Sequence, residues 1–248
     1  MTAELRIGTS GWHYAHWSSG VFYPEGMGSA EWLGHYAKSF DSVEVNNTFY
    51  HLPREETFES WRRGVPEGFE FAVKASRFIT QVKRLKDAGE SMSKFLSSAE
   101  LLREKLGPVL FQLPPSMKRD DGRLRGALEY LSEQSVVPQV RAVFELRNAS
   151  WLVDEVYEAL ERHGAALCLS DLEVCPVERP LDSGFVYMRR HGPSGPYMGS
   201  YTDEQLKRDA EGISAWLKDG RPVYVYFNND AEGYAVKNAL RLKELVAR

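Results

Sequence analysis

The feature that most constrains the fold is a short strand-like run that occurs eight times and ends each time in polar residues. The last run, VYVYFNND (223–230), shows the pattern: apolar and aromatic residues lead directly into Asn228, Asn229 and Asp230. Short runs rich in β-branched and aromatic residues indicate β-strands. The eight runs span residues 5–10, 41–47, 69–76, 108–115, 141–148, 165–171, 184–192 and 223–230.

Helical patterns separate most of these runs. Ser29 and Thr202 each precede an apolar face with helical spacing and are predicted to be N-caps, with Gln205 as the capping-box partner of Thr202. The stretch 172–183 contains two prolines and lacks helical periodicity, so we expect a loop there in place of a helix. The predicted helices span 29–40, 54–65, 93–107, 122–134, 152–164, 202–220 and 231–248.

Strands that alternate with helices favour an α/β fold with a parallel sheet. The chain has 248 residues, which matches the usual size of a single (β/α)8 barrel of the TIM type. We therefore predict one TIM-barrel domain over 1–248, with a helix replaced by a loop around 172–183. An open doubly wound sheet is the alternative, and the even spacing of the strands favours the barrel.

Charge, cysteines and hydropathy disfavour several classes of protein. The net charge of −4 argues against a protein that coats nucleic acid non-specifically, although it permits a local basic cleft. Cys168 and Cys175 have no CxxC spacing and no adjacent His cluster, so we expect a buried and an incidental thiol rather than a metal or redox site. The sequence contains neither a run of membrane-span length nor a signal-peptide pattern, which predicts a cytoplasmic protein without a membrane partner.

The polar residues that end the strands are the candidate functional residues. In a (β/α)8 barrel the carboxyl ends of the strands and the loops after them form the active-site face. Residues at i and i+2 of a strand share a face, so polar pairs with this spacing are expected to point inward together. The predicted rim consists of Glu44, Asn46, Lys74, Gln112, Glu145, Arg147, Asp171, Arg189, His191, Asn228 and Asn229.

Two interpretations of this rim compete. The charges can form a ring of salt bridges that only stabilises the barrel end, but buried ion pairs are weak stabilisers, so this much charge favours binding. Lys74, Arg147 and Arg189 suit a phosphate or carboxylate group. The candidate acid and base catalysts are Glu44, Glu145 and His191, and the other rim residues are candidate substrate contacts.

No metal site is predicted. Of the six histidines only His191 ends a strand, which disfavours a zinc site built from His. A single Mg²⁺ or Mn²⁺ on carboxylates and amides stays open, and no other cofactor is indicated. The chain contains no Walker motif, no GxGxxG and no G-x-S-x-G elbow.

Three loops after strands extend the predicted rim. The aromatic loop 11–26 is interpreted as a lid over the barrel end, with a stacking platform for a sugar or base as the alternative, in which Trp12 and Tyr14 contact the ligand. The basic loop 77–87 would lengthen an anion-binding cleft, and the Gly/Pro-rich loop 191–202 would form a flap or phosphate cradle.

Several of these segments together resemble the YecE-like family, known as domain of unknown function 72. They are GTSGWHYAHWSSGVFYP, FDSVEVNNTFYHLP, FAVKASRFIT, LGPVLFQLPPS, FELRNASW, MRRHGPSGPY and VYVYFNND, in this order along nearly the whole chain. The resemblance implies a TIM-type barrel and supplies no reaction; its matching positions are the rim residues above apart from Asp171. Two departures stand out, because the family pattern often has His where this chain has Gln81 and Asn148.

The leading functional hypothesis is an enzyme that acts by acid/base chemistry on an anionic, phosphate-bearing substrate, as a hydrolase, lyase or isomerase. A nucleic-acid-binding or nucleic-acid-processing protein is the first alternative, and a non-catalytic ligand-binding barrel is the second. The expected partner is an anionic small molecule, and the sequence leaves the oligomeric state open.

Overall fold

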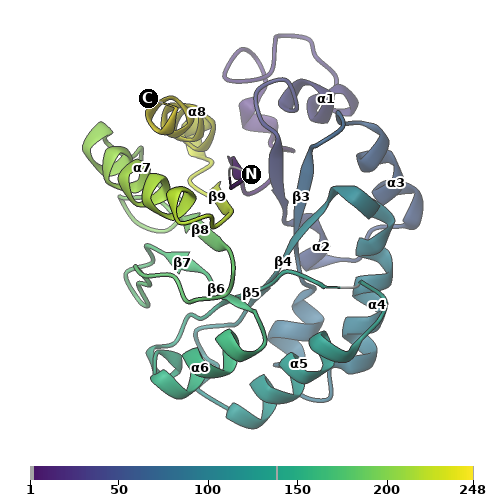
Figure 1. The fold of residues 1–248 in the computed structure, drawn as a ribbon. Helices are drawn as coiled ribbons and strands as arrows, with labels where there is room; N and C mark the ends of the chain where they lie inside the picture. Colours follow the sequence, from purple (N-terminus) through teal and green to yellow (C-terminus); the bar gives the residue numbers. More distant parts are fainter. Residues whose placement is uncertain (1–2, 138, 248) are drawn as a thin grey trace.

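The computed structural model describes residues 3–137 and 139–247. Strands occupy the centre and helices surround them, as the ribbon shows (Figure 1). Neighbouring strands in the sheets run parallel, so the predicted α/β class is confirmed. The strands are β1 (Leu5–Thr9), β2 (Ser42–Val45), β3 (Glu70–Lys74), β4 (Leu106–Gln112), β5 (Ala142–Glu145), β6 (Ala166–Leu167), β7 (Leu169–Ser170), β8 (Val186–Arg190) and β9 (Val223–Phe227).

The hydrogen-bonded strands form two sheets and not the closed ring that we expected. One sheet has the order β1-β9-β8-β7 and the other β2-β3-β4-β5-β6. The predicted strand 165–171 belongs to both sheets, because β6 pairs with β5 and β7 pairs with β8. The backbone amide of Cys168, between β6 and β7, donates to the Phe144 carbonyl at 2.9 Å, so the chain passes from one sheet to the other without a gap.

The ring is interrupted between β1 and β2, where a side chain takes the place of ladder hydrogen bonds. The Tyr36 hydroxyl accepts from the Thr9 amide at 2.9 Å and donates to the Ser42 carbonyl at 3.2 Å. Gly8 lies so close to β2 that a Cβ atom there would be 2.1 Å from the Ser42 carbonyl oxygen. The two sheets therefore touch at this edge through a buried tyrosine and a glycine.

The seven predicted helices appear in the predicted order with shifted ends, and a short helix at Asn47–Tyr50 was not predicted. The capping box is confirmed: the Thr202 amide donates to Gln205 Oε1 at 2.9 Å, and the Gln205 amide donates to the Thr202 hydroxyl at 3.3 Å. Ser29 is not an N-cap, because it lies inside a short 3₁₀ turn (Ser29–Glu31) that follows Gly28. The helices are α1 (Trp32–Tyr36), α2 (Asn47–Tyr50), α3 (Glu55–Arg63), α4 (Gly89–Ala99), α5 (Asp121–Glu133), α6 (Asp154–Arg162), α7 (Asp203–Lys218) and α8 (Tyr234–Val246).

Two further expectations concern loops and turns. The stretch 172–183 is a loop without a helix, as predicted. The predicted helix 93–107 instead begins at Gly89, and after Ala99 the chain narrows to a 3₁₀ segment (Glu100–Lys105), so Leu106 and Gly107 already belong to β4. Further turns are 3₁₀ at Ala15–Trp17, Ala149–Trp151 and Ala231–Gly233, and π-helical at Phe78–Val82.

Alternate strand residues supply two apolar layers. A large cluster lies between strands and helices, and a smaller one consists of alternate strand residues such as Leu110, Val143 and Tyr224. Cys168 and Cys175 are free and buried. None of the helices in the described ranges is both long and apolar enough to cross a bilayer.

Candidate functional site

Five ionisable side chains meet at the carboxyl ends of β2, β5 and β8, and we call them the charged cluster. Four of them are almost entirely buried, with at most 1% exposure, and the fifth, Arg147, has a side chain that is 12% exposed. The i, i+2 spacing predicted this convergence, because alternate residues of a strand face the same side. The members are Glu44, Glu145, Arg147, Arg189 and His191.

Arg189 joins the two carboxylates of the charged cluster. Its Nη2 donates to Glu44 Oε1 at 2.8 Å and its Nε to Glu44 Oε2 at 3.0 Å. Its Nη1 donates to Glu145 Oε2 at 2.6 Å. Each guanidinium nitrogen thus donates to a carboxylate oxygen. We expected Arg189 to bind an anionic group of a substrate, but in the structure it binds two carboxylates of the protein itself.

Glu145 remains ionised in this setting. Burial alone would raise the pKa of its carboxyl, but the guanidinium groups of Arg189 and Arg147 outweigh burial and hold that pKa well below its ordinary range. Arg147 Nη2 lies 2.9 Å from Glu145 Oε1. A carboxylate held in its charged form is a poor proton donor, so Glu145 suits the role of an electrostatic partner better than that of a general acid.

His191 is neutral. Burial and the adjacent Arg189 charge lower its pKa to about 3. Its Nε2 lies 3.0 Å from Glu145 Oε1 and 3.3 Å from one guanidinium nitrogen each of Arg147 and Arg189, so this atom faces one acceptor and two donors. Its Nδ1 is buried and has no hydrogen-bond partner among the residues described.

Lys74 lies at the end of β3 and, unlike Arg147 and Arg189 of the charged cluster, forms no salt bridge with the described residues. It is 8% exposed, and its Nζ lies 4.2 Å above the ring of Phe49. In the part of the chain that the structure describes, no carboxylate oxygen comes within 4 Å of this Nζ. Burial and the positive charge of Arg189 lower the pKa of Lys74 to about 7, although Glu145 and Glu44 oppose the shift.

A cavity of about 640 Å³ opens above Lys74 and Arg189. Its size lies in the range of small-molecule sites. The wall combines aromatic rings with amide groups and contains both Lys74 and Arg189. The remaining lining residues are Gly11, Trp12, His13, Tyr14, Asn46, Asn47, Tyr50, Thr57, Trp61, Tyr197, Asn228 and Asp230.

The aromatic loop 11–26 acts both as packing and as cavity wall. Trp17 and Tyr23 are fully buried, and the Trp17 indole donates to the Asp230 carbonyl at 2.8 Å. Trp12 packs edge-on against Trp61 at 5.4 Å between ring centroids, and Tyr14 donates to the Ser10 carbonyl at 2.6 Å. Trp12 and Tyr14 still line the cavity, so the loop both packs into the core and presents rings to the cavity.

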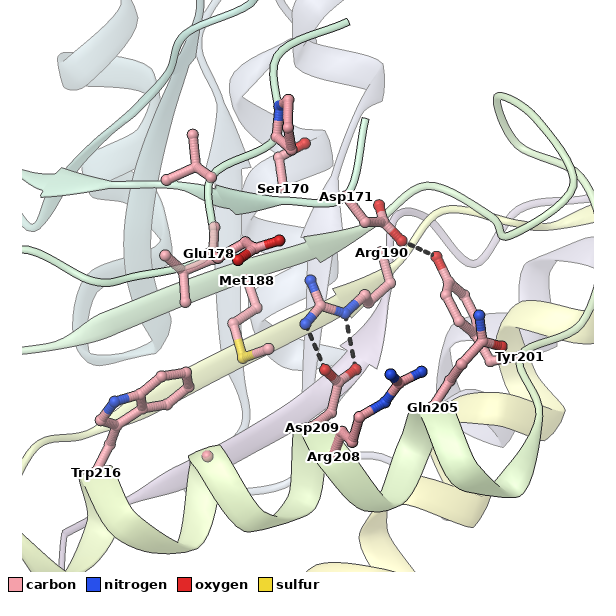
Figure 2. A pocket seen from close by; sticks show the side chains of 14 residues that line it. Ser170, Asp171, Glu178, Met188, Arg190, Tyr201, Gln205, Arg208, Asp209 and Trp216 are labelled. Carbon is pink, nitrogen blue, oxygen red and sulfur yellow. Dashed lines mark hydrogen bonds and ion pairs between the residues drawn. The ribbon is translucent and has the colours of Figure 1, made fainter. Parts of the chain in front are cut away.

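Two predicted rim residues point elsewhere. Asp171 accepts from the His191 amide at 2.8 Å and from the Tyr201 hydroxyl, and it lines a different pocket of about 510 Å³ beside α7 (Figure 2). There Arg190 donates twice to Asp209, at 2.7 and 2.5 Å. Asn229 turns toward α8, where its Nδ2 donates to Asn238 Oδ1 at 2.9 Å.

The other predicted substrate contacts are near the cavity to different degrees. Asn46 lines it, donates to the Ser10 carbonyl at 3.1 Å and has a buried Oδ1 without a partner among the described residues. Asn228 also lines it, whereas Gln112 is buried beside Glu145 in the strand register and does not.

Sequence reasoning missed several residues of the site. Tyr197 lines the cavity and stacks near His191, with 6.0 Å between the ring centroids. Tyr187 lies below the cavity wall and donates to Glu44 Oε2 at 2.7 Å. Tyr187 carried a signal, since it shares the i, i+2 spacing with Arg189 and His191. Tyr50, Thr57 and Trp61 carried none, because they lie on α2 and α3 and reach the cavity only through the fold.

The described residues contain no group of three or more His, Cys, Asp or Glu side chains arranged to hold a metal ion. The carboxylates of the charged cluster instead face guanidinium groups, which satisfy the same oxygens that a cation would use.

The family model described as "Protein of unknown function DUF72" matches residues 6–248. The chain belongs to this family. It is 26% identical to "UPF0759 protein YunF" of Bacillus subtilis (strain 168), over 98% of this chain and 94% of that protein. "UPF0759 protein YecE" of Escherichia coli (strain K12) is 32% identical over a shorter alignment, 33% of this chain and 30% of that protein. The resemblance to the YecE-like family is thereby confirmed.

Solved structures show the same fold. A DUF72 family protein from Thermotoga maritima MSB8 is 30% identical, with a TM-score of 0.85 over 99% of this chain and 100% of that chain. SacUVDE has a TM-score of 0.62 at 9% identity over 99% of this chain and 98% of that chain. D-psicose 3-epimerase has a TM-score of 0.55 at 12% identity, over 98% of this chain and 96% of that chain. At such identities these last two show the fold alone, which is TIM-barrel-like.

Proposed function

We propose that this DUF72 protein is an enzyme that binds an anionic substrate in the cavity above Lys74 and uses Lys74 for proton transfer. One observation carries the proposal: Lys74 is a buried cation in the cavity wall, and no carboxylate oxygen of the described residues lies within 4 Å of its Nζ. Arg147 and Arg189 balance Glu44 and Glu145 within the charged cluster. The other carboxylate of the cavity wall, Asp230, lies 3.3 Å from His16 Nε2. A protonated Lys74 therefore presents to the cavity a positive charge that no carboxylate contacts directly, which favours a negative ligand group.

Acid/base chemistry follows from the same arrangement. A lysine with a pKa of about 7 is present in both protonation forms near neutral pH. An anion in the cavity would favour the charged form, so binding would draw a proton onto Nζ. A phosphate-bearing substrate suits this site best, because the cavity also offers the amides of Asn46 and Asn228 for its other polar groups. The reaction class would be hydrolase, lyase or isomerase.

The charged cluster would act as support for Lys74. We expected Glu44 and Glu145 to be catalytic, but both accept hydrogen bonds from Arg189. Their negative charges would instead raise the pKa of Lys74 and so oppose the effect of burial. His191 would extend the same network through Glu145.

We also infer that the two sheets act as one barrel in a single domain over 1–248, since the β1–β2 edge is bridged by Tyr36.

The test is calorimetric titration of inorganic phosphate, phosphorylated sugars and nucleotides at pH 7, in buffers of different ionisation enthalpy. Binding should draw up to about half a proton per site onto the protein, because Lys74 is half protonated before the anion arrives. Lys74→Met should abolish binding. Lys105→Met is the matched control, since Lys105 is also 8% exposed but donates to the Arg62 and Val65 carbonyls and does not line the cavity. A bound anion without proton uptake would contradict the role of Lys74.

A nucleic-acid-binding function is the second candidate, and exposed rings near the cavity favour it. Tyr50 is 69% exposed and Tyr197 40%, and both line the cavity mouth; Phe78, in the basic loop 77–87, is 49% exposed. Exposed rings beside basic groups suit a stacked single strand. Binding of a short single-stranded oligonucleotide that weakens steeply between 50 and 200 mM salt would support this candidate. A ligand that binds without turnover would instead support a non-catalytic ligand-binding barrel.

A further inference from the structure

The Lys74 amine is placed as a nucleophile would be. Its Nζ sits over the Phe49 ring at 4.2 Å, and the residue lines the cavity together with Trp12 and Trp61. The described part of the chain offers this Nζ no carboxylate within 4 Å. The amine therefore faces an aromatic ring and has no salt bridge that a reaction would have to break.

Lys105 shows what a structural buried lysine looks like in the same chain. Its Nζ donates to the carbonyls of Arg62 and Val65, both at 2.7 Å. Those hydrogen bonds use two of its N–H groups, as expected of a structural lysine. Lys74 is as buried as Lys105 but opens onto a cavity of about 640 Å³.

We propose that Lys74 forms a covalent imine with the aldehyde or ketone group of an anionic substrate held in this cavity. The proposal rests on the proposed function, because it uses the same cavity and the same anion preference. It narrows the substrate class to anionic carbonyl compounds. Active-site lysines that are desolvated beside another cation react in this manner.

The step needs no oxidant or reductant. The Nζ lone pair attacks the carbonyl carbon, and the C=O π electrons move to oxygen, which takes the proton that nitrogen releases. The hydroxyl of the resulting carbinolamine takes a proton from water in the cavity and leaves as water, while the nitrogen lone pair forms the C=N bond and the nitrogen keeps its remaining hydrogen. Protonated on nitrogen, this imine withdraws electrons from the neighbouring carbon and acidifies its hydrogen, which is the basis for acid/base chemistry on the substrate.

The charges that face Lys74 keep its amine available. Burial and Arg189 lower the pKa to about 7, Arg147 adds to this effect, and Glu145 and Glu44 oppose it. About half of the amine is then neutral at pH 7, whereas an exposed lysine is neutral in fewer than about one molecule in a thousand.

Reductive trapping tests the proposal. Wild-type protein is incubated at pH 7 with sodium cyanoborohydride and dihydroxyacetone phosphate, pyruvate or uncharged dihydroxyacetone. Intact mass and peptide mapping then locate the adduct. We expect one adduct per chain, on Lys74, formed at least ~10-fold faster with the two anions than with dihydroxyacetone, a difference of about 1.4 kcal/mol. Scattered adducts on exposed lysines, with Lys74 unmodified, would overturn the imine.

Two variants separate the imine from simple anion binding. Lys74→Arg keeps the charge but forms no imine with a carbonyl, so it should retain a phosphate-induced rise in Tm and lose the adduct. Lys105→Arg should be labelled on Lys74 like the wild type. Phosphate binding by the wild type without an adduct on Lys74 would overturn the imine and leave the proposed function standing. Absence of both binding and adduct would overturn both, and the wild-type mapping decides the matter even where a variant fails to fold.

Discussion

The two ends of the strands each carry a cluster of charged residues, and their surroundings differ. At the amino ends, Glu70 lies 2.8 Å from Arg141 and 3.4 Å from Arg6, whose side chains are 35% and 17% exposed. At the carboxyl ends, Arg189 lies between two carboxylates with no exposed surface at all. The amino-end cluster is wet at its edge, whereas the carboxyl-end cluster is dry and borders a cavity.

The two buried lysines repeat this contrast. Lys105 has two carbonyl acceptors, while Lys74 has an aromatic ring beneath it and a cavity above it. If the carboxyl ends of the strands serve function and the amino ends serve stability, as we propose, substitutions at the two ends should differ in their cost.

Removing one carboxylate from each end should give the largest difference. Glu145→Gln leaves Arg189 and Arg147 without their buried counter-charge and should lower the free energy of unfolding by about 3–5 kcal/mol. Glu70→Gln should cost about 1–2 kcal/mol, because water reaches Arg6 and Arg141. Urea denaturation of both variants at pH 7 measures the pair. Equal losses would remove the distinction between a dry and a wet end.

Replacing the two lysines should change stability in opposite directions. Lys74→Met should raise the free energy of unfolding by roughly 2–4 kcal/mol at pH 7, because the folded protein no longer holds a desolvated ammonium. Lys105→Met should lower it by about 2 kcal/mol, because two buried carbonyls lose their donor. Urea midpoints of both variants against the wild type provide the check, and destabilisation of both would show that Lys74 is structural.

The pH dependence of the Lys74 effect has a definite sign. The folded-state pKa of Lys74, about 7, lies below its ordinary value of 10.5. Between these values the unfolded chain binds more protons, so wild-type stability should rise with pH through this window. The advantage of Lys74→Met should therefore be greatest below pH 7 and shrink as pH approaches 10.

Two tyrosine hydroxyls, each of which donates to a carboxylate at one end of the strands, provide a smaller test. Tyr187 donates to Glu44 at 2.7 Å in a buried site, and Tyr224 donates to Glu70 at 3.2 Å in a partly buried one. Tyr187→Phe should cost about 2 kcal/mol and Tyr224→Phe about 1 kcal/mol, because only the second carboxylate can take water as a substitute. Thermal unfolding at pH 7 gives both values, and the reverse order would contradict the burial argument.

Salt should produce the smallest difference. At 1 M NaCl the screening length is about 3 Å, so the stability difference between wild type and Glu70→Gln should shrink by about 0.5 kcal/mol. The difference for Glu145→Gln should stay within error, because ions do not enter the dry cluster. Repeating the urea series in 1 M NaCl shows whether salt separates the two ends.

Much of the fold could be read from local patterns. The Thr202–Gln205 capping box and the loop at 172–183 depend on residues within a few positions of each other, and both were predicted. The i, i+2 rule brought Glu145 and Arg147 to the same network. Ser29 was misassigned because a serine inside a 3₁₀ turn and a serine at an N-cap have the same local sequence signal.

Local patterns predicted the elements but not the partners of single site residues. The strand pattern by itself determined the α/β class, the order of the elements and the end at which polar residues gather, since alternation and capping are local physics. Tertiary structure decided that Arg189 pairs with Glu44, that Asp171 and Asn229 turn away, and that Tyr36 bridges β1 and β2. It also decided that Lys74 has no carboxylate partner among the described residues. Such pairing depends on how close segments far apart in the sequence come to one another, which only the packed chain establishes.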